Sequence, residues 1–268
     1  MLEEIVELVH STKRIIVNEN DSLDVSAKGM KNYVTNIDIA VSNYIKEQLS
    51  KMYPDYEFMD EEIDSDEHDF KKPTWVLDPI DGTTNLVHGY NQSAVSLALL
   101  ANGIPILGVV YNPFTEETYT AEINKGAYLN GKHIKVSDVN DIEHSLISIG
   151  TYALDRSDKK EEDENIELMN NVFRHCDRIR RLGSSALDLC HVACGRLDAM
   201  YERLLAPWDI AAGMIIVREA GGRVTDFDNN LIQPTKRTQI IATNGKVHEK
   251  MLDILFPSRQ TDRTNKKI

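Results

Sequence analysis

The chain is short of three features, and each shortage excludes a class of protein. It has only three cysteines, Cys176, Cys190 and Cys194, and this odd, clustered set excludes a disulfide framework and indicates a reduced, cytoplasmic protein. It has no run of about 18 apolar residues and begins with acids among its first residues, so we expect neither a membrane span nor a signal peptide. Its 30 basic residues are outnumbered by 43 acidic ones, and the net charge of -13 argues against nucleic acid as a partner.

What the chain does have is material for a buried core, since 41% of its 268 residues are hydrophobic. Apolar residues at helical spacing predict two amphipathic helices in its first part, over residues 2–9 and 41–52. The chain is therefore expected to be globular and to open with helices.

Strand patterns follow these helices. Residues 56–59 and 75–77 are predicted strands, and residues 93–122 are predicted to form strands joined at Asn-Gly and Asn-Pro turns. A second Asn-Gly hairpin is predicted within residues 126–136. The N-terminal half, residues 1–140, is therefore predicted to be α+β, with a meander-like and mostly antiparallel sheet.

Strands and helices alternate in the C-terminal half, residues 141–256, which indicates an α/β layer. A charged segment, residues 155–165, is predicted to be a loop, and the polar tail, residues 257–268, is predicted to be disordered. The predicted strands are 145–150, 198–202, 223–227 and 239–244, and the predicted helices are 166–175, 184–195 and 208–222.

Two aspartates, Asp78 and Asp81, end the strand in the stretch WVLDPIDGTTN. Asp-Pro-x-Asp-Gly is good turn chemistry by itself, because proline fixes φ and glycine accepts positive φ. Two carboxylates this close repel each other by several kcal/mol at an effective dielectric of about 20, and a turn does not need that repulsion. A divalent cation removes it, and Mg²⁺ prefers carboxylate, carbonyl and water oxygens. The pair therefore favours a metal site, with a plain turn as the alternative.

A metal site needs further ligands, and two other acidic clusters provide candidates. Glu61 and Glu62 follow a predicted strand, and Asp209 lies in the opening turn of the helix predicted over 208–222. Each has an ordinary alternative, since the two glutamates suit a solvated loop and Asp209 suits a helix cap. Their combination favours the metal site, because strand ends and helix starts are where α/β proteins build sites.

Together these motifs resemble the inositol monophosphatase family of Mg²⁺-dependent, lithium-sensitive phosphatases. The matching stretches are DPIDGTTN, the upstream DEE, PWDIAAG followed by EAGG, VTNID and GRLDAMYE, in the family's order between Lys28 and Gly222. The resemblance implies a layered αβαβα sandwich, an α+β half followed by an α/β half, with the metal site in the cleft between them. It also implies a homodimer.

The resemblance implies six metal ligands, five carboxylates and one backbone carbonyl. The first Mg²⁺ would be held by Glu61, Asp78 and the carbonyl of Ile80, the second by Asp78, Asp81 and Asp209, and a looser third would lie near Glu61 and Glu62. One ion would lower the pKa of a water and another would stabilise the leaving oxygen, so no phospho-enzyme is required.

The catalytic pair that the resemblance implies is Asp38 and Thr83. In the family the threonine and an upstream acid orient the water, while the alternative for Asp38 is favourable charge in the first turn of a helix. The amides of Gly82 and Thr83 are expected to bind phosphate oxygens where the strand gives way to a helix. Glu61 is expected to serve in catalysis as well as in metal binding.

Contacts to the leaving group are implied for Ser184, Ser185, Glu202 and Asp209. Glu202 matches the position that accepts a hydroxyl hydrogen bond from the inositol ring, and the two serines fall where ring contacts are made, with a helix N-cap as their alternative. The chain departs from the family at Leu204, where many relatives have glycine. A bulkier residue therefore lies beside the leaving group.

The predicted function is Mg²⁺-dependent hydrolysis of a small phosphate monoester, with inositol monophosphate as the leading substrate. NADP(H), fructose 1,6-bisphosphate and adenosine 3′,5′-bisphosphate, which relatives also cleave, are the alternatives. A rival from another class is a regulatory role in which the fold binds RNA polymerase or another partner. The acids favour the enzyme, because a binding protein has no use for mutually repelling carboxylates.

Overall fold

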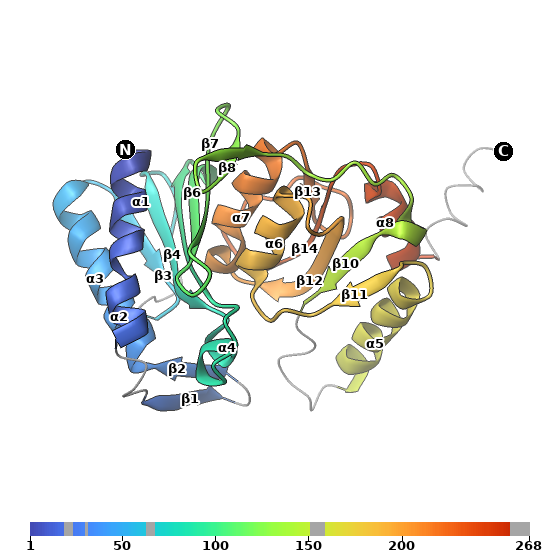
Figure 1. Ribbon diagram of the computed structural model, residues 1–268, viewed down its shortest axis with the longest axis horizontal. Helices are drawn as coiled ribbons and strands as arrows, with labels where there is room; N and C mark the ends of the chain where they lie inside the picture. The colour runs from blue at the N-terminus through green and yellow to red at the C-terminus, as the bar shows by residue number, and fades with distance from the viewer. Residues whose placement is uncertain (19–23, 30–31, 63–67, 151–158, 258–268) are drawn as a thin grey trace.

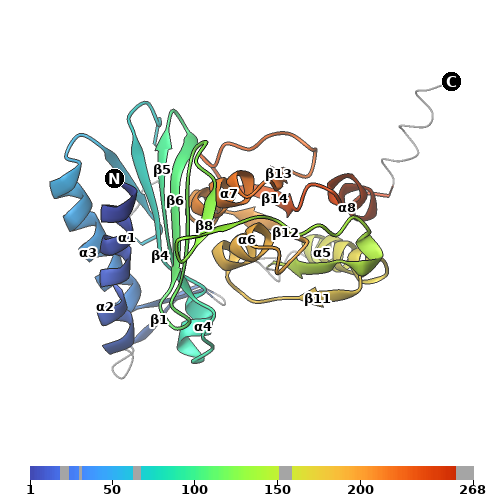
Figure 2. The ribbon, with the colours of Figure 1, turned by 45° about the horizontal axis from the view of Figure 1, so that its top comes forward.

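The protein is built from alternating layers of helix and sheet, an αβαβα sandwich (Figures 1 and 2). The predicted fold class, a layered αβαβα sandwich, is therefore confirmed. The computed structural model describes residues 1–18, 24–29, 32–62, 68–150 and 159–257. The outer helical layer on the N-terminal side contains α1 (Leu2–Ser11), α2 (Lys13–Asn18) and α3 (Asn36–Met52).

The first sheet is a seven-stranded meander in which the strands follow sequence order. Its first pair is parallel and the others are antiparallel, as the sequence predicted for most of this sheet. Asn102 and Gly103 join one pair with positive φ at both residues, and Asn130 and Gly131 do the same for the last pair. The strands are β3 (Glu57–Asp60), β4 (Thr74–Asp81), β5 (Ala94–Ala101), β6 (Ile104–Asn112), β7 (Glu117–Glu122), β8 (Ala127–Leu129) and β9 (Lys132–Ile134).

The second sheet is five-stranded and mixed, in the order β11-β10-β12-β14-β13. The pairs of β10 are parallel because helices connect these strands, whereas β14 pairs antiparallel with both of its neighbours. The strands are β10 (Leu146–Ile149), β11 (Arg178–Arg180), β12 (Ala199–Leu205), β13 (Arg223–Thr225) and β14 (Thr238–Thr243).

Three apolar cores hold the layers together, and the middle one positions the site. Helices α6 (Ser185–Ala193) and α7 (Pro207–Glu219) lie between the two sheets and are buried along most of their length (Figure 2). α7 reads as apolar on all sides, which is what a helix covered by sheets on both faces requires. A second core lies under α1 and α3, and a third lies under α5 (Lys159–Phe173) and α8 (His248–Leu255).

Several elements differ from the sequence prediction. α5 begins at Lys159, so residues 159–165 are helical where a loop was predicted. The charged residues Lys159, Lys160, Asp163 and Glu164 are exposed, whereas Glu161 and Glu162 are half-buried. The prediction missed α2, α8, the edge strand β11, and the hairpin of β1 (Val25–Gly29) and β2 (Asn32–Thr35). These elements are short and depend on packing against the rest of the fold. The tail predicted to be disordered, residues 257–268, lies outside the described residues except for Pro257.

The described residues also include two further short elements, α4 (Thr83–Val87) and a 3-10 turn over Ile142–His144. Within the part of the chain that the structure describes, no helix combines the length and apolar character needed to cross a membrane.

Candidate active site

A bulge in β4 brings Asp78 and Asp81 to the same face of the first sheet. Asp78 pairs with Ser96 and Asp81 with Ala94, so three steps along β4 oppose two steps along β5. Side chains alternate between faces with a period of two, so without the extra residue these aspartates would point in opposite directions. Pro79 falls inside this bulge, where a residue without an N–H costs no ladder hydrogen bond.

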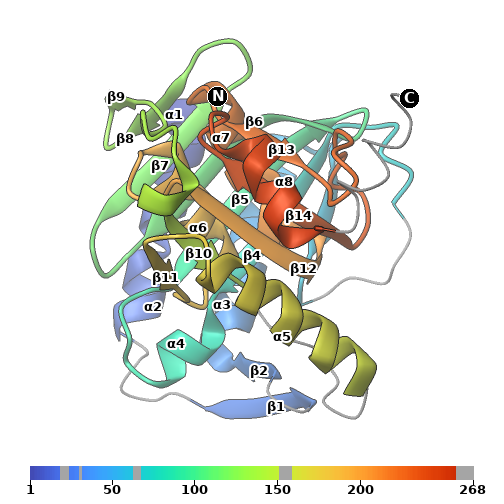
Figure 3. The same cartoon turned by 90° about the vertical axis from the view of Figure 1, so that its right-hand side faces the viewer.

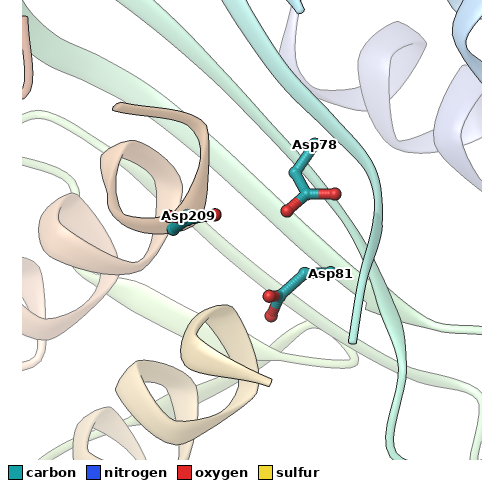
Figure 4. Close-up of side chains that lie close together, drawn as sticks. All are labelled: Asp78, Asp81 and Asp209. Carbon is teal, nitrogen blue, oxygen red and sulfur yellow. The ribbon is translucent and has the colours of Figure 1, made fainter. Parts of the chain in front are cut away.

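Asp209 approaches the same point from the start of α7, as Figure 4 shows. One oxygen from each of Asp78, Asp81 and Asp209 lies within 4.8 Å of the others. Asp209 Oδ2 also accepts a hydrogen bond from the amide of Ala206 (2.6 Å), so the helix-cap alternative is realised together with the clustering. Asp81 Oδ2 accepts from the amide of Ala186 (2.8 Å) and from the hydroxyl of Ser184, at the start of α6.

Burial and mutual repulsion make these carboxylates costly to ionise in the absence of a cation. Burial raises the pKa of Asp78 well above its usual value, and the charges of Glu61, Asp81 and Asp209 raise it further. The pKa of Asp209 is raised well above its usual value for the same reasons, first by burial and then by Glu61 and Asp81. Burial raises the pKa of Asp81 to about 6, although its hydrogen bond from Ser184 works in the opposite direction.

The parallel pairing of β3 with β4 brings Glu61 to this cluster. Asp60 pairs with Leu77, so the residue that follows β3, Glu61, falls beside Asp78, and its amide donates to the carbonyl of Leu77 (3.3 Å). Glu61 is half-buried and lines the same cavity as the aspartates. Glu62 is also half-buried, but its amide bonds to Asp60 Oδ1 (2.7 Å) and it is not among the cavity-lining residues.

Thr83 connects the acidic cluster to Asp38. Its hydroxyl lies 3.0 Å from Asp38 Oδ1 and 3.1 Å from the carbonyl oxygen of Ile80. Asp38 is fully buried, and its other oxygen caps α3 by accepting from the amide of Thr35 (2.9 Å). Burial raises the pKa of Asp38, against the effect of these hydrogen bonds. The capping role and the pairing with Thr83 therefore exist side by side.

Gly82 precedes Thr83 in a left-handed conformation, with φ at +89°. A Cβ at this position would lie 3.0 Å from the carbonyl oxygens of Gln92 and Gly183. Glycine is therefore required on both counts, and the resulting sharp turn directs the chain from β4 into α4.

Glu202 forms the far side of the site on β12. It is 4% exposed, and Ser185 donates a hydrogen bond to its Oε2 (2.6 Å). Its side chain lies across Gly150, where an added Cβ would overlap Cγ and Cδ of the glutamate. Ser184 caps α6, accepting from the amide of Leu187 (3.3 Å), so the N-cap alternative is realised at this serine.

A cavity of about 590 Å³ joins these groups. The predicted site residues that line it are Glu61, Asp78, Ile80, Asp81, Gly82, Thr83, Ser184, Ser185, Glu202 and Asp209. Asp38 lies behind Thr83 and reaches the cavity through that residue's hydroxyl.

Among the cavity-lining residues that the sequence prediction missed are residues of α5 and α6. α5 contributes Glu161, Glu162, Asn165, Ile166 and Met169, and no sequence signal indicated this because the helix was placed only in part. Asp188 of α6 also lines the cavity while being 2% exposed; Ser148 donates to its Oδ2 (2.8 Å), and burial raises its pKa well above the usual value. The sequence does contain a signal for Asp188, because an acid between two leucines in an apolar helix is unusual.

The donor set fits a divalent cation. Oxygen ligands whose pKa values are raised by burial and then by the charges of their neighbours are what a hard cation such as Mg²⁺ stabilises in the ionised form. The αβαβα sandwich with carboxylates gathered where β4 meets α6 and α7 defines a class of protein, the metal-dependent phosphatases that act on small phosphate esters.

Comparison with known proteins identifies the family. The family model described as "Inositol monophosphatase family" matches residues 2–259, and the chain belongs to this family of phosphatases. It is 40% identical over 235 residues to inositol monophosphatase 3 of Solanum lycopersicum, covering 86% of this chain and 87% of that one. It is 40% identical over 237 residues to the Nus factor SuhB of Pasteurella multocida, covering 88% and 87%.

Solved structures agree with this assignment. The Thermotoga maritima IMPase superimposes with a TM-score of 0.86 at 34% identity, covering 97% of this chain and 98% of that one. An IMPase/NADP phosphatase complexed with Mg²⁺ and phosphate gives a TM-score of 0.84 at 25% identity, covering 94% and 95%.

Proposed function

We propose that this protein hydrolyses a small phosphate monoester with Mg²⁺ as its cofactor, and that inositol monophosphate is its leading substrate. The observation that carries the proposal is the convergence of Asp78, Asp81 and Asp209 within 4.8 Å in the wall of a cavity. The names of the relatives support the substrate, and the relative complexed with Mg²⁺ and phosphate supports the cofactor.

The residues that would hold the cations are those of the acidic cluster. Glu61, Asp78 and the Ile80 carbonyl would hold one ion, Asp78, Asp81 and Asp209 a second, and Glu61 and Glu62 a looser third. When bound, the ions supply a water of lowered pKa and compensate the charge that develops on the ester oxygens. The cluster contributes its preorganised position, since Asp81 and Asp209 are each held by backbone amides.

Thr83 and Asp38 would orient the attacking water. The single hydroxyl proton of Thr83 is directed to Asp38 Oδ1 or to the Ile80 carbonyl, so its lone pairs are left to accept a hydrogen bond from the water. Asp38, fixed by Thr35, holds that orientation from behind the cavity. The amides of Gly82 and Thr83 would bind phosphate oxygens.

Glu202 would accept a hydroxyl of the leaving group through its carboxylate, which Ser185 and Gly150 hold in place. Ser184 and Ser185 line the same wall and are proposed as ring contacts, with their hydroxyls also supporting Asp81 and Glu202. Asp209 would contact the substrate beside its metal.

The test is phosphate release from a panel of esters with Mg²⁺. The panel contains inositol 1-phosphate, NADP, fructose 1,6-bisphosphate and adenosine 3′,5′-bisphosphate, each with and without lithium. We expect inositol 1-phosphate to be cleaved with the highest kcat/KM and lithium to inhibit. A higher value for NADP would favour the alternative that the IMPase/NADP phosphatase relative supports.

A second candidate function is binding to RNA polymerase or another protein, with phosphatase activity incidental. The relative named a Nus factor supports it. Absence of Mg²⁺-dependent release from every ester, with a stable complex retained, would favour this role. Homodimerisation and a cytoplasmic location are proposed on the family resemblance and composition, and sedimentation and cell fractionation test them.

A further inference from the structure

β12 carries a bulge where it passes the candidate site. Glu202 pairs with Ile240 and Leu205 with Thr238, so three steps along β12 oppose two steps along β14. The extra residue keeps Glu202 and Leu205 on the same face of the second sheet, where the glutamate lines the cavity and the leucine joins the middle core. The position of Glu202 relative to the core therefore depends on this bulge.

The residue inside the bulge, Leu204, has a strained backbone. Its φ is +60°, in the left-handed region, which a residue with a Cβ disfavours. Such a conformation persists only where the surrounding structure holds it. The sheet cannot supply that hold, because its pairing is interrupted between Glu202 and Leu205. The Leu204 side chain is 40% exposed, so packing holds it only in part.

Arg237 supplies a contact to this residue. Its Nη1 donates a hydrogen bond to the carbonyl of Leu204 (3.1 Å), and its guanidinium carbon lies 5.9 Å from the centroid of the Trp208 ring. Arg237 directly precedes Thr238, the partner of Leu205, so the guanidinium closes the bulge from the neighbouring strand. A planar group that donates and stacks at the same time has a defined position.

The other side of the bulge is fixed by α5. Figure 3 shows α5 beside β12, and Arg203 joins the two elements by donating to Glu164 Oε2 (3.3 Å) and Asn165 Oδ1 (3.2 Å). The bulged segment is thus held by two arginines, one from its own strand and one from the start of β14.

We propose, resting on the phosphatase function above, that Arg237 is a positioning residue, which holds the strained bulge at Leu204 and so keeps the Glu202 carboxylate in place for a hydroxyl of the leaving group. Without the guanidinium, Leu204 would relax towards negative φ, and a rotation about one backbone bond redirects the chain on both sides of it. Glu202 lies two residues away, and its side chain has little room because it lies across Gly150.

The metal site has its own anchor. The amide of Ala206 donates to Asp209 Oδ2 (2.6 Å), and α7 is buried between the two sheets. Loss of Arg237 should therefore affect binding of the leaving group more than the cations.

The test is a double-mutant cycle with inositol 1-phosphate and Mg²⁺. For Arg237→Ala we expect kcat/KM to fall roughly tenfold, mainly through KM, as the loss of a hydrogen bond to a charged group predicts. In a Glu202→Gln background the same change should alter kcat/KM by less than about twofold, because the contact that Arg237 supports is already lost. In a Leu204→Gly background its effect should be equally small, because glycine adopts positive φ without strain.

The matched control is Lys236→Ala, which removes a neighbouring positive charge. Lys236 is exposed and is not among the cavity-lining residues, so kcat/KM should not change. Melting temperatures verify that each variant is folded.

A tenfold loss from Arg237→Ala that persists in the Glu202→Gln background would overturn the inference alone, because the guanidinium would then act through its charge or through the metal site. An unchanged kcat/KM in Arg237→Ala would overturn it as well. Wild type that releases no phosphate from inositol 1-phosphate with Mg²⁺ would instead overturn the proposed function.

Discussion

Asp78→Asn tests the acidic cluster through stability rather than activity. At a separation of 4.8 Å and an effective dielectric of 20, two ionised carboxylates repel by roughly 3.5 kcal/mol, and Asp78, Asp81 and Asp209 form three such pairs. The protein without metal must therefore hold protons on this cluster, whereas Mg²⁺ binds the ionised form. Magnesium at 100 times its Kd would stabilise the folded state by about 2.7 kcal/mol.

For a chain of this length that free energy corresponds to a rise in Tm of roughly 5–10 °C. We expect this rise for the wild type when MgCl₂ replaces NaCl at equal ionic strength, measured by thermal unfolding. In Asp78→Asn the rise should be lost or reduced to a small fraction. The variant without Mg²⁺ should be at least as stable as the wild type, because an amide at this buried position needs no proton.

Asp55→Asn is the control, since Asp55 is exposed in the connection between α3 and β3. It should show the full magnesium effect. If Mg²⁺ stabilises the wild type no more than Na⁺ does, or if Asp78→Asn retains the whole shift, the cluster is not a divalent cation site.

Three other predictions address neighbouring groups. Asp38→Asn should lower kcat by roughly 10²-fold, as expected for the loss of a group that positions the water, with little change in Mg²⁺ affinity by calorimetry; near-normal turnover would remove Asp38 from the mechanism. Gly150→Ala should displace the Glu202 side chain and raise KM for inositol 1-phosphate about tenfold or more, as the loss of a hydrogen bond to a charged group predicts, with kcat less affected. An unchanged KM would contradict the role of Gly150 in positioning Glu202 for the substrate. Asp81 has a folded-state pKa of about 6, above its unfolded value, so between these two pKa values the metal-free folded protein binds more protons than the unfolded chain. Its stability should fall as pH rises from about 4 to about 6, while the stabilisation by Mg²⁺ should grow over the same range; pH-independent melting with and without the ion would refute this.

Much of the architecture could be predicted from the sequence alone, because turns and helices are specified by residues close together in the chain. Two Asn-Gly turns with alternating apolar flanks predicted two hairpins of the first sheet, and helical spacing predicted α1, α3, α6 and α7. The same reasoning misjudged the start of α5, because a charged segment reads as a loop unless its buried face, at Asn165 and Leu168, is known.

The candidate site shows the same division between local and distant information. Asp78, Asp81 and Asp209 were selected from sequence because acids at strand ends and helix starts are costly unless something uses them. Their actual proximity depends on a one-residue bulge in β4 and on α7 being buried between two sheets. Neither feature is encoded in the residues of the motif itself.

The sequence by itself determined which chemical groups are present and which short segments turn, extend or coil, since those preferences act between residues a few positions apart. Only the tertiary structure decided that Glu202 lies across Gly150, that residues of α5 line the cavity, and that Leu204 has a left-handed backbone conformation. These are contacts between segments far apart in the chain. They follow from how whole layers pack, and packing is a property of the complete fold rather than of any one stretch of it.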